Sequence, residues 1–414
     1  MREGWVEIEF KKVVDKVSTS NQKIRQKDYL TQGKYPVIDQ GQELIGGYTD
    51  DENKLLKCGL PVIVFGDHTK ILKLIQFQFA PGADGTKVLE PKTCILPEYL
   101  IYLTKILVFK IKDKGYARHY QYIEKQYLPL ASLPEQRVIV SKIEQLFSEL
   151  DNGVNNLKVA KDKLEIYRQA VLKKAFEGEL TNTRNIKWVT LGELCDGVEY
   201  GTATKSTNEG LVPVLRMGNI QNGRFNWNDL KYTNESGEIE KYHLKLNDVL
   251  FNRTNSAEHV GKTAIYKSEK EAIFAGYLIR IHYKKDEVDG DYLNYFLNCH
   301  IAKKYGNKVK SFGVNQTNIN GTKLKKYPFP KTTLYEQTQI VKEIETRLSV
   351  CDNILTNIEE GLEKSEALRQ SILKKAFEGK LLSDSELKAC RKESDWEPAE
   401  KLLERIKKDK NQRH

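Results

Sequence analysis

The chain has 414 residues, of which 39% are hydrophobic and 30% charged, and its formal net charge is +10. This length predicts two or three domains with their own cores. No stretch approaches the eighteen apolar residues of a membrane span, and the N-terminal sequence MREGWVEIEF lacks the apolar core of a signal peptide, so we expect a cytoplasmic protein. The six cysteines are scattered, with no CxxC pair, which argues against structural zinc and a disulfide framework.

Residues 1–131 are predicted to form a β-rich globular domain. The runs PVIDQ, LPVIVF and LIQFQF have the length and composition of short strands, and Gly, Asn and Asp separate them. Residues 182–332 have the same character, with LVPVLRM, NDVLFN and AIFAGYLIRIHY. The segment LPVIVFGDHT (60–69) is laid out like LNDVLFNRTN (246–255), and Trp5-Val6 matches Trp188-Val189, so we expect two related domains.

A long helix is expected after each globular domain, at residues 132–181 and 333–382. Residues 133–180 align without a gap with residues 334–381, with 23 identities in 48 positions. Each copy opens with a capping box, Ser132–Glu135 or Thr333–Glu336, and each stops at a glycine, Gly178 or Gly379. At 1.5 Å per residue, each helix would be about 65 Å long.

The apolar residues of both helices recur at heptad spacing, as in Ile143, Leu150, Leu157 and Leu164 of the first copy. Such a stripe needs a partner helix. The other copy in the same chain is the simplest partner, and a coiled-coil homodimer is the alternative. Residues 383–414 are predicted to form a polar helical tail. The whole chain is therefore expected to be an α+β protein, with two β-rich domains separated by two antiparallel coiled-coil helices and related by a pseudo-two-fold axis.

The positive charge is concentrated in the globular domains. Residues 1–130 have 20 Lys and Arg against 16 Asp and Glu, and residues 187–333 have 22 against 16. The helical repeats have 8 against 8 and 7 against 9. A polyanion would therefore meet the globular domains, whereas the helices suit contacts with protein.

We find no persuasive catalytic or metal-binding motif in the sequence. Gly261-Lys262-Thr263 lacks the first glycine of a P-loop, and no GxGxxG, HExxH or Asn-Pro-Pro-aromatic run is present. Asp67-His68-Thr69 has no nucleophile at a readable spacing. No catalytic residue and no metal ligand is predicted.

Several loops combine glycine with cationic, amide and aromatic side chains, a mixture that suits contacts with a nucleic-acid backbone and with base edges. GDHTK (66–70) and NRTNS (252–256) each follow an apolar strand, and GYARHY (115–120) and KSFGVNQTN (310–318) each precede a long helix. RMGN (216–219) is a further example. Taken singly, each could be an ordinary polar turn, and only their similar arrangement in two basic domains favours binding. The predicted DNA-binding residues are His68, Thr69, Lys70, Gly115, Tyr116, Arg118, His119, Arg216, Asn219, Arg253, Thr254, Asn255, Lys310, Ser311, Gly313, Asn315 and Gln316.

The alternation of variable and repeated regions resembles the DNA-specificity (S) subunit of type I restriction–modification systems. The resemblance rests on LPEQRVIVSKIEQLFSELD (133–151), LYEQTQIVKEIETRLSVCD (334–352), the two LKKAFEG phrases, NDVLFNRTNSAEHVGKTA (247–264) and GYARHY. It covers nearly the whole chain. One departure is that the second repeat continues for more than thirty residues, whereas the first ends in a short linker at 181–187.

The resemblance implies a non-catalytic subunit in which each globular domain is a target-recognition domain that reads one half of an asymmetric DNA site. The helices would set the gap between the half-sites. They would also dock two methyltransferase subunits, which bind S-adenosylmethionine and methylate adenine, while restriction subunits add ATP- and Mg-dependent cleavage. No cofactor is expected on this chain. The residues expected to dock partner subunits are Phe176, Phe377, Glu135, Gln136, Glu336 and Gln337. The alternatives are a coiled-coil scaffold that binds only proteins, and a nuclease with an unrecognised site.

Overall fold

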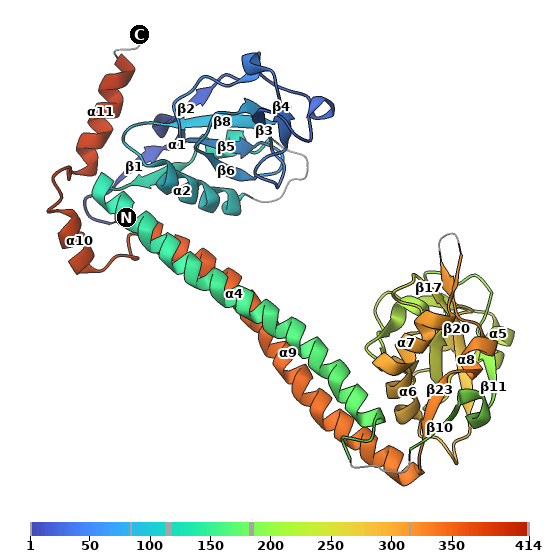
Figure 1. Ribbon diagram of the computed structural model, residues 1–414. Helices are drawn as coiled ribbons and strands as arrows, with labels where there is room; N and C mark the ends of the chain where they lie inside the picture. The colour runs from blue at the N-terminus through green and yellow to red at the C-terminus, as the bar shows by residue number, and fades with distance from the viewer. Residues whose placement is uncertain (1, 83–84, 112–117, 182–185, 314–315, 412–414) are drawn as a thin grey trace. The chain divides into compact units, whose positions relative to one another are not determined.

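The protein forms two compact units, each of which contains one globular domain. The computed structural model describes residues 2–82, 85–111, 118–181, 186–313 and 316–411, with side chains as far as Arg405. Unit 1 consists of Met1–Leu157 and Glu360–His414, and unit 2 consists of Lys158–Glu359 (Figure 1). Each unit therefore takes the first part of one long helix and the last part of the other. None of the described helices is long and apolar enough to cross a membrane.

The globular domain of unit 1 contains a four-stranded sheet, a three-stranded sheet and the antiparallel pair of β1 and β9. The order of the first sheet is β2-β8-β5-β6, and that of the second is β4-β3-β7. The strand β5 has five consecutive buried residues, which is the pattern of a strand covered on both faces. The elements are β1 (Val6–Glu9), α1 (Phe10–Val13), β2 (Val14–Val17), β3 (Tyr35–Ile38), β4 (Gly47–Thr49), β5 (Val62–Gly66), β6 (Leu72–Ile75), β7 (Ala80–Pro81), β8 (Thr86–Pro91), α2 (Pro97–Lys110), α3 (Tyr120–Ile123) and β9 (Tyr127–Leu130).

The globular domain of unit 2 has the sheets β11-β20-β16-β18 and β15-β12-β19, and also a three-stranded sheet, β17-β22-β21. Its elements are β10 (Lys187–Thr190), β11 (Cys195–Tyr200), β12 (Val212–Leu215), β13 (Ile220–Gln221), β14 (Arg224–Phe225), β15 (Lys231–Thr233), α5 (Ser236–Tyr242), β16 (Val249–Asn252), β17 (Thr254–Asn255), β18 (Thr263–Ile265), β19 (Ile273–Phe274), β20 (Leu278–Tyr283), α6 (Gly290–Asn298), α7 (His300–Val309), β21 (Ser311–Phe312), β22 (Thr317–Asn318), α8 (Gly321–Lys325) and β23 (Pro328–Lys331).

The two domains share one topology, as the sequence echoes predicted. In unit 1, β3 pairs antiparallel with β4 and parallel with β7. In unit 2, β12 pairs antiparallel with β15 and parallel with β19. The matched segments form β5 and β16, each lying between two antiparallel neighbours. The pair β1–β9 likewise corresponds to the pair β10–β23. The described part of unit 2 adds the sheet β17-β22-β21 to this shared arrangement.

The long helices α4 (Leu133–Phe176) and α9 (Leu334–Phe377) begin and end at the predicted signals. The Glu135 backbone N–H donates to Ser132 Oγ at 3.4 Å, and the Ser132 N–H donates to Glu135 Oε2 at 3.2 Å. Thr333 and Glu336 repeat this capping box. Both helices end at a glycine with positive φ, +80° at residue 178 and +73° at residue 379, a backbone conformation that glycine adopts most readily.

Within each unit the two helices pack antiparallel, which confirms the intrachain coiled coil. In unit 2, Lys161 pairs with Glu359 at 3.1 Å and Arg168 pairs with Asp352 at 2.7 Å, so an advance of seven residues along α4 is a retreat of seven along α9. In unit 1, Asp151 pairs with Arg369. A Cβ atom at Gly361 would lie 3.1 Å from Leu157, so the backbones approach closely at this level.

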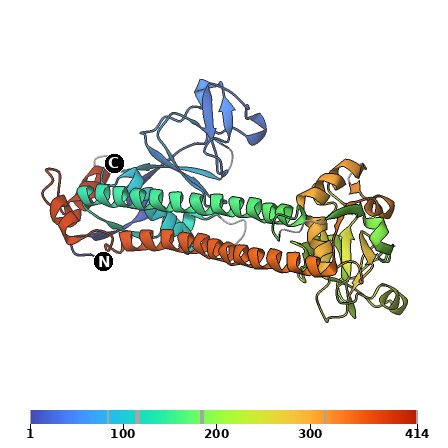
Figure 2. The ribbon, with the colours of Figure 1, turned by 60° about the horizontal axis from the view of Figure 1, so that its bottom comes forward.

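The C-terminal tail forms the helices α10 (Asp384–Cys390) and α11 (Ala399–Asn411) and belongs to unit 1. Figures 1 and 2 place these helices beside the beginning of α4. Arg137 forms two 2.8 Å hydrogen bonds to Asp395, and Lys142 pairs with Glu386 at 3.1 Å. The predicted polar tail is thus helical but amphipathic, because Leu387 and Leu402 are buried in the core of unit 1.

Candidate nucleic-acid interface

Two of the predicted loops of unit 2 meet in one small sheet. The segment 252–256 contributes β17 and the segment 310–318 contributes β21 and β22, so residues some sixty positions apart become neighbours. Asn318 Nδ2 donates to Thr254 Oγ1 at 2.7 Å, and the Ile319 N–H donates to the Arg253 carbonyl at 2.8 Å. The structure thus brings two of the predicted binding loops together, and Arg253 lies directly before the shared sheet.

The guanidinium of Arg253 is fixed in place without a carboxylate. Its Nε donates to the Gly276 carbonyl at 2.9 Å, and its Cζ lies 4.8 Å from the centroid of the Tyr200 ring. Among the residues that the structure describes, this guanidinium forms no ion pair. An arginine that stacks on an aromatic ring keeps its charge and its terminal donors in a defined orientation, which suits recognition of a phosphate or a guanine edge.

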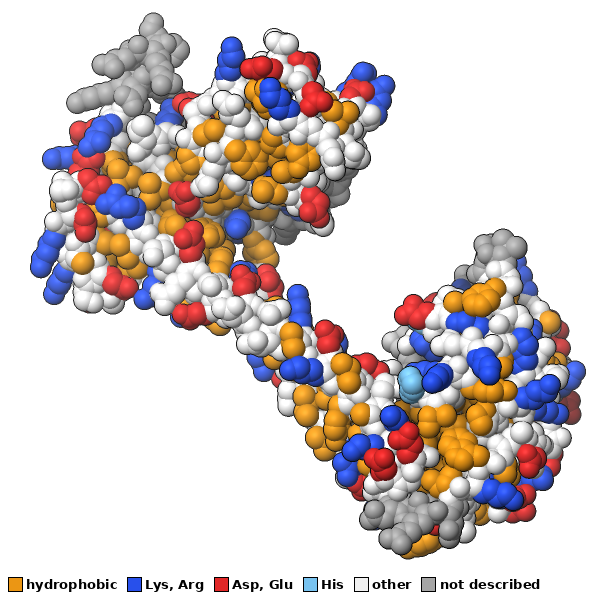
Figure 3. Space-filling model, viewed as in Figure 1, with side chains coloured by type: hydrophobic (Ala, Val, Ile, Leu, Met, Phe, Trp, Pro, Cys, Tyr) orange, Lys and Arg blue, Asp and Glu red, His pale blue; other side chains and the backbone are white. Residues whose placement is uncertain are grey.

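Arg216, Arg253 and Asn255 line one groove of about 1190 Å³ in unit 2. Lys205 and Lys262 line the same groove. Figure 3 shows Lys and Arg side chains, in blue, distributed over the visible face of this unit. A groove of this size with several cationic side chains can hold the edge of a polyanion, which supports the predicted role of these loops.

Three of the predicted residues of unit 2 use their polar atoms within the protein. Asn219 is 3% exposed, and its Nδ2 donates to the carbonyls of Asn226 and Asn228 at 3.1 Å each. Thr254 is 7% exposed and is engaged by Asn318. Arg216 donates to the side chain of Asp229 at 3.1 Å. Asn219 therefore supports the groove wall and Thr254 supports the small sheet beside it, so the side chains of these two residues serve the protein's own structure.

Asn255 keeps only part of its hydrogen-bonding capacity. Its Oδ1 accepts the Ser256 N–H at 2.8 Å, and the side chain is half-buried. Recognition of adenine by asparagine uses the amide as a donor and an acceptor at once. The hydrogen bond from the Ser256 N–H therefore competes with adenine for the acceptor Oδ1 of Asn255. The donor Nδ2 of Asn255 takes no part in this turn.

The remaining predicted residues of unit 2 are on or beside the hairpin β21–β22. Lys310 Nζ donates to the Ala257 carbonyl at 2.9 Å and to Asn307 Oδ1 at 2.7 Å. Ser311 Oγ accepts from Lys323. The Gly313 N–H donates to the Gln316 carbonyl at 2.8 Å and closes the hairpin. Asn315 lies outside the described residues. Lys310 thus anchors the hairpin, whereas Ser311, Gly313 and Gln316 are exposed on it.

The predicted loops of unit 1 also come together, around a residue that was not predicted. Asp67 Oδ1 accepts the Tyr120 N–H at 2.8 Å, and the Asp67 carbonyl accepts the His119 N–H at 2.9 Å. Asp67 also pairs with Lys87 at 3.4 Å. His119 is fully buried, with Nδ1 2.9 Å from the Asp67 carbonyl, so its predicted DNA contact gives way to a role in joining the loops. Arg118, next to it, is exposed. Gly115 and Tyr116 lie outside the described residues.

The turn after β5 is shaped by Gln40, another residue that was not predicted. The Thr69 hydroxyl donates to the Gln40 carbonyl at 2.7 Å, and the His68 N–H donates to Gln40 Oε1 at 3.3 Å. Lys70 has a φ of +62°, which turns the chain back toward β6. His68 and Lys70 are half-buried and Thr69 is exposed, so the tip of this turn has access to solvent.

The predicted docking residues Gln136 and Gln337 are fully buried in equivalent networks. Gln136 Nε2 donates to the carbonyls of Cys94 and Ala131, and its Oε1 accepts the Leu96 N–H. Gln337 makes the same three bonds, because its Nε2 donates to the carbonyls of Glu287 and Thr332 and its Oε1 accepts the Asp289 N–H. Because both side chains have no exposed surface, they attach each long helix to its own globular domain, and a partner subunit has no access to them.

The capping glutamates and the two phenylalanines also contact their own unit. Glu135 is 7% exposed and accepts from Trp5 Nε1 at 3.2 Å, whereas Glu336 is partly exposed. Phe176 is fully buried, with its ring 5.1 Å from Tyr292 and 5.2 Å from Phe296. Phe377 stacks edge-on at 5.1 Å from Tyr99. Each phenylalanine therefore joins the end of one long helix to the globular domain that precedes the other. Of the six residues predicted to dock a partner subunit, four are buried within their own unit. Only Glu336 and Phe377 are partly exposed, and docking of a partner at these two residues stays a prediction.

Lys205 and Lys262 line the groove, and Tyr200 packs against the guanidinium of Arg253; the sequence reasoning missed all three residues. The segment EYGTATKS (199–206) has the same mixture of Gly, Lys, Thr and an aromatic residue as the selected loops, so a compositional signal was present. Its contact with Arg253 joins residues that are far apart in the sequence. No group of His, Cys, Asp and Glu among the described residues has the arrangement of a metal site.

Comparison with known proteins gives one consistent result. The family described as type I restriction modification DNA specificity domain matches residues 2–158 and 184–364. The StySPI specificity subunit of a type I restriction enzyme from Salmonella potsdam is 29% identical over 343 residues, which cover 78% of this chain and 73% of the relative. The EcoKI specificity subunit from Escherichia coli strain K12 is 26% identical over 78% of this chain and 74% of its own length.

Two solved structures have the same fold. A chain from a structural study of the assembly and conformational transition of the type I R-M system superimposes with a TM-score of 0.71, with 18% identity and coverage of 92% of this chain and 99% of that chain. The HsdS subunit from Thermoanaerobacter tengcongensis gives a TM-score of 0.54, with 19% identity and coverage of 92% and 98%. At these identities the likeness concerns the fold.

Proposed function

Since this chain belongs to the family of type I restriction modification DNA specificity domains, we propose that it is the DNA-reading subunit of a type I restriction–modification complex. The observation that carries the proposal is the groove of unit 2, which is lined by two arginines and two lysines. One of these arginines, Arg253, forms no ion pair among the described residues. The names of the relatives, which are specificity subunits, support the same role.

The DNA site of this subunit is bipartite and asymmetric. The two globular domains share a topology, but their loops differ in sequence, so each domain reads a different half-site. The paired helices α4 and α9 set the number of base pairs between the half-sites, because a helical rod holds a fixed length that a flexible linker does not.

The chain itself is not an enzyme. It directs two methyltransferase subunits, which bind S-adenosylmethionine and methylate adenine, and restriction subunits, which use ATP and Mg²⁺ to translocate and cleave DNA. Two methyltransferase subunits fit the internal repeat, since each repeat offers an equivalent helical surface. This chain binds no cofactor of its own.

The test is to produce the chain together with a type I methyltransferase subunit and to sequence the DNA of the host for methylated adenine. We expect one bipartite motif, with methylation in both halves. Replacing Arg216 and Arg253 by alanine should relax the half of the motif that unit 2 reads and leave the other half unchanged. Methylation that is absent, or that follows no bipartite motif, would contradict the proposal. A chain that binds the methyltransferase but not DNA would indicate a protein scaffold instead.

A further inference from the structure

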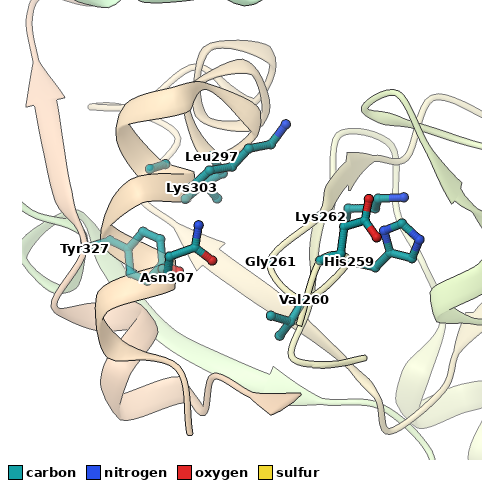
Figure 4. Close-up of a pocket in the computed structure, with 11 residues that line it drawn as sticks. His259, Val260, Gly261, Lys262, Leu297, Lys303, Asn307 and Tyr327 are labelled. Carbon is teal, nitrogen blue, oxygen red and sulfur yellow. The ribbon is translucent and has the colours of Figure 1, made fainter. Parts of the chain in front are cut away.

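A second cavity of unit 2 lies beside the DNA groove, between helix α7 and the segment 256–262. Its volume is about 330 Å³. Figure 4 shows Lys303 and Asn307 on α7 at one side of the cavity, with His259 and Lys262 on the other side. Val260 and other apolar side chains form part of the lining. His259 and Lys262 also line the DNA groove, so the two hollows share a wall.

The wall that carries Lys262 is held in position by the end of β16. Asn252 is fully buried, and its N–H donates to the Lys262 carbonyl at 2.8 Å while its carbonyl accepts the Gly261 N–H at 2.8 Å. Its Nδ2 donates to the His259 carbonyl at 3.3 Å. Gly261 has a φ of +91°, which favours glycine at this turn. Backbone and side-chain hydrogen bonds of the protein itself therefore hold this wall.

The opposite wall is equally close-fitting. Helix α7 approaches Tyr327 so closely that a Cβ atom at Gly306 would lie 2.5 Å from the Tyr327 hydroxyl. Lys303 lies about one turn before Gly306 on this helix, lines the cavity, and is itself exposed.

Lys262 and Lys303 have no counterion. Within the described part of the chain, neither ammonium makes a hydrogen bond or an ion pair. Other lysines of the same domain do, since Lys267 pairs with Asp291 at 2.6 Å and Lys284 with Glu287 at 3.6 Å. Two cations that line the same cavity without a carboxylate partner can share one bound anion.

The charged surroundings leave a net positive site. Both lysines also line a smaller cavity of about 120 Å³, which Glu165 and Arg168 share, and Arg168 is engaged by Asp352. Glu258 faces the larger cavity. Desolvation by the surrounding protein lowers the pKa of Lys303, Glu165 opposes this shift, and the Lys262 ammonium adds to it. An anion bound between the two lysines would relieve their repulsion.

We propose that Lys262 and Lys303 form a phosphate-binding site, which holds one phosphate group in the cavity beside the DNA groove. Lysine suits this role because its ammonium is a compact charge that binds phosphate without a fixed geometry. The Asn307 amide is available at the same wall to donate to a phosphate oxygen. If the phosphate is that of a DNA backbone, the site rests on the proposed function and positions the duplex without reading its sequence. A free phosphate compound offers the same chemistry.

The test uses the full chain with Lys262→Gln, Lys303→Gln and both together. Lys304→Gln is the matched control, since it removes the same charge from the same helix but does not line the cavity. Two quantities are measured: the slope of log K for DNA against log [KCl], and the rise in melting temperature when inorganic phosphate replaces chloride at constant ionic strength. Each lost phosphate contact reduces the slope by about 0.9. Lys262→Arg with Lys303→Arg should restore both quantities.

We expect the double variant to have a shallower slope by about one and to lose the phosphate-induced rise in melting temperature, while the control keeps both. If the double variant loses the phosphate-induced rise in melting temperature but keeps the salt dependence of DNA binding, the site exists and binds a free phosphate compound. If the double variant matches the control in both measurements, the site does not exist. If the wild-type chain fails to bind any DNA, the proposed function fails, and the phosphate measurement still decides the site.

Discussion

Arg168 and Asp352 form an ion pair between α4 and α9 in unit 2, with 2.7 Å between Nη2 and Oδ1. The repeat offset of 201 relates Arg168 to Arg369 and Asp352 to Asp151. Arg369 and Asp151 form the equivalent ion pair in unit 1. The internal symmetry therefore extends from the sequence repeat to individual contacts between the helices. These pairs fix the antiparallel register at two separate levels.

Neutralising either aspartate should weaken the helix pair by a small and equal amount. The aspartates are 63% and 67% exposed, so Asp352→Asn and Asp151→Asn should each lower the free energy of unfolding by about 0.2–1 kcal/mol. The double variant should show the sum, because the pairs share no residue. Denaturant midpoints measure this. Asp162→Asn, at an exposed position of α4, is the control, and equal midpoints for all three single variants would show that the pairs contribute nothing.

The buried glutamines should matter far more than the ion pairs. Gln136→Ala and Gln337→Ala each leave two backbone carbonyls and one N–H without a partner, and each such buried group costs about 1–3 kcal/mol. Thermal unfolding should show a large loss for either variant. Gln145→Ala, which removes an exposed hydrogen bond within α4, should have little effect. A Gln136→Ala chain as stable as this control would mean that water replaces the lost bonds.

If the paired helices set the gap between the half-sites, lengthening both helices should widen that gap by a calculable amount. An insertion into one helix alone would shift the register, so a heptad should be added to both, after Leu157 and after Glu359, where the two units meet in sequence. Seven residues add about 10 Å to each helix, so the gap between half-sites should grow by about three base pairs. Sequencing of methylated sites measures the gap. Altered half-sites, or an unchanged gap, would contradict the role of the helices as a spacer.

Arg253 and Tyr200 should act together in the recognition of one base pair. If Arg253 reads a guanine, Arg253→Ala should reduce DNA affinity by about 1–3 kcal/mol at a single position of the site. Tyr200→Leu removes the ring beneath the guanidinium and should cost about 0.5–1 kcal/mol. Binding to a set of substituted duplexes distinguishes the cases, since a uniform loss across all sequences would make Arg253 a phosphate contact. Tyr335→Leu, on the exposed start of α9, is the control.

Acid should loosen the tail of unit 1 through Glu386. Hydrogen bonds from the Ser383 hydroxyl and N–H, and the pair with Lys142, lower the pKa of Glu386 from 4.5 to about 2. A carboxyl whose pKa is lower in the folded chain contributes stability above the unfolded pKa, and this contribution is lost as the pH falls from about 5 to about 2. Because the side chain is partly exposed, we expect a loss of about 1 kcal/mol.

Glu386→Gln tests this pH dependence. The variant should be less stable than the wild-type chain at pH 7, and the difference should shrink as the pH is lowered toward 3. Melting temperatures across the pH range measure both. A difference that stays constant with pH would assign the effect to packing of the tail instead of to the charge of Glu386.

The long helices could be predicted closely because their signals are local. Ser132 and Thr333 lie three residues before the glutamates that they cap, and Gly178 and Gly379 end the helices in a backbone conformation that few other residues adopt. Heptad spacing predicted that the helices would pair, and the shared strand pattern predicted two similar domains. Each of these inferences needs only short segments of sequence, or two copies of one segment.

The site was harder to predict, because a polar side chain looks the same in sequence whether its partner is DNA or its own backbone. His119 and Asn219 are of residue types suited to DNA contacts, but the structure buries both against carbonyls of the chain. Asp67 was set aside as a failed catalytic candidate, and it proves to join two loops of unit 1. These outcomes depend on contacts between distant residues, and the spacing of residues along the chain does not contain them.

The contacts of Phe176 and Phe377 have a consequence for the inheritance of DNA specificity. Each ring belongs to one helical repeat but packs on an aromatic side chain of the domain that precedes the other repeat, Phe176 on Tyr292 and Phe377 on Tyr99. Recombination that exchanges one globular domain for a foreign one thus severs an aromatic contact and must rebuild it. A hybrid subunit would therefore keep the packing at the end of its long helix only where the incoming domain carries an aromatic side chain in the place of Tyr99 or Tyr292.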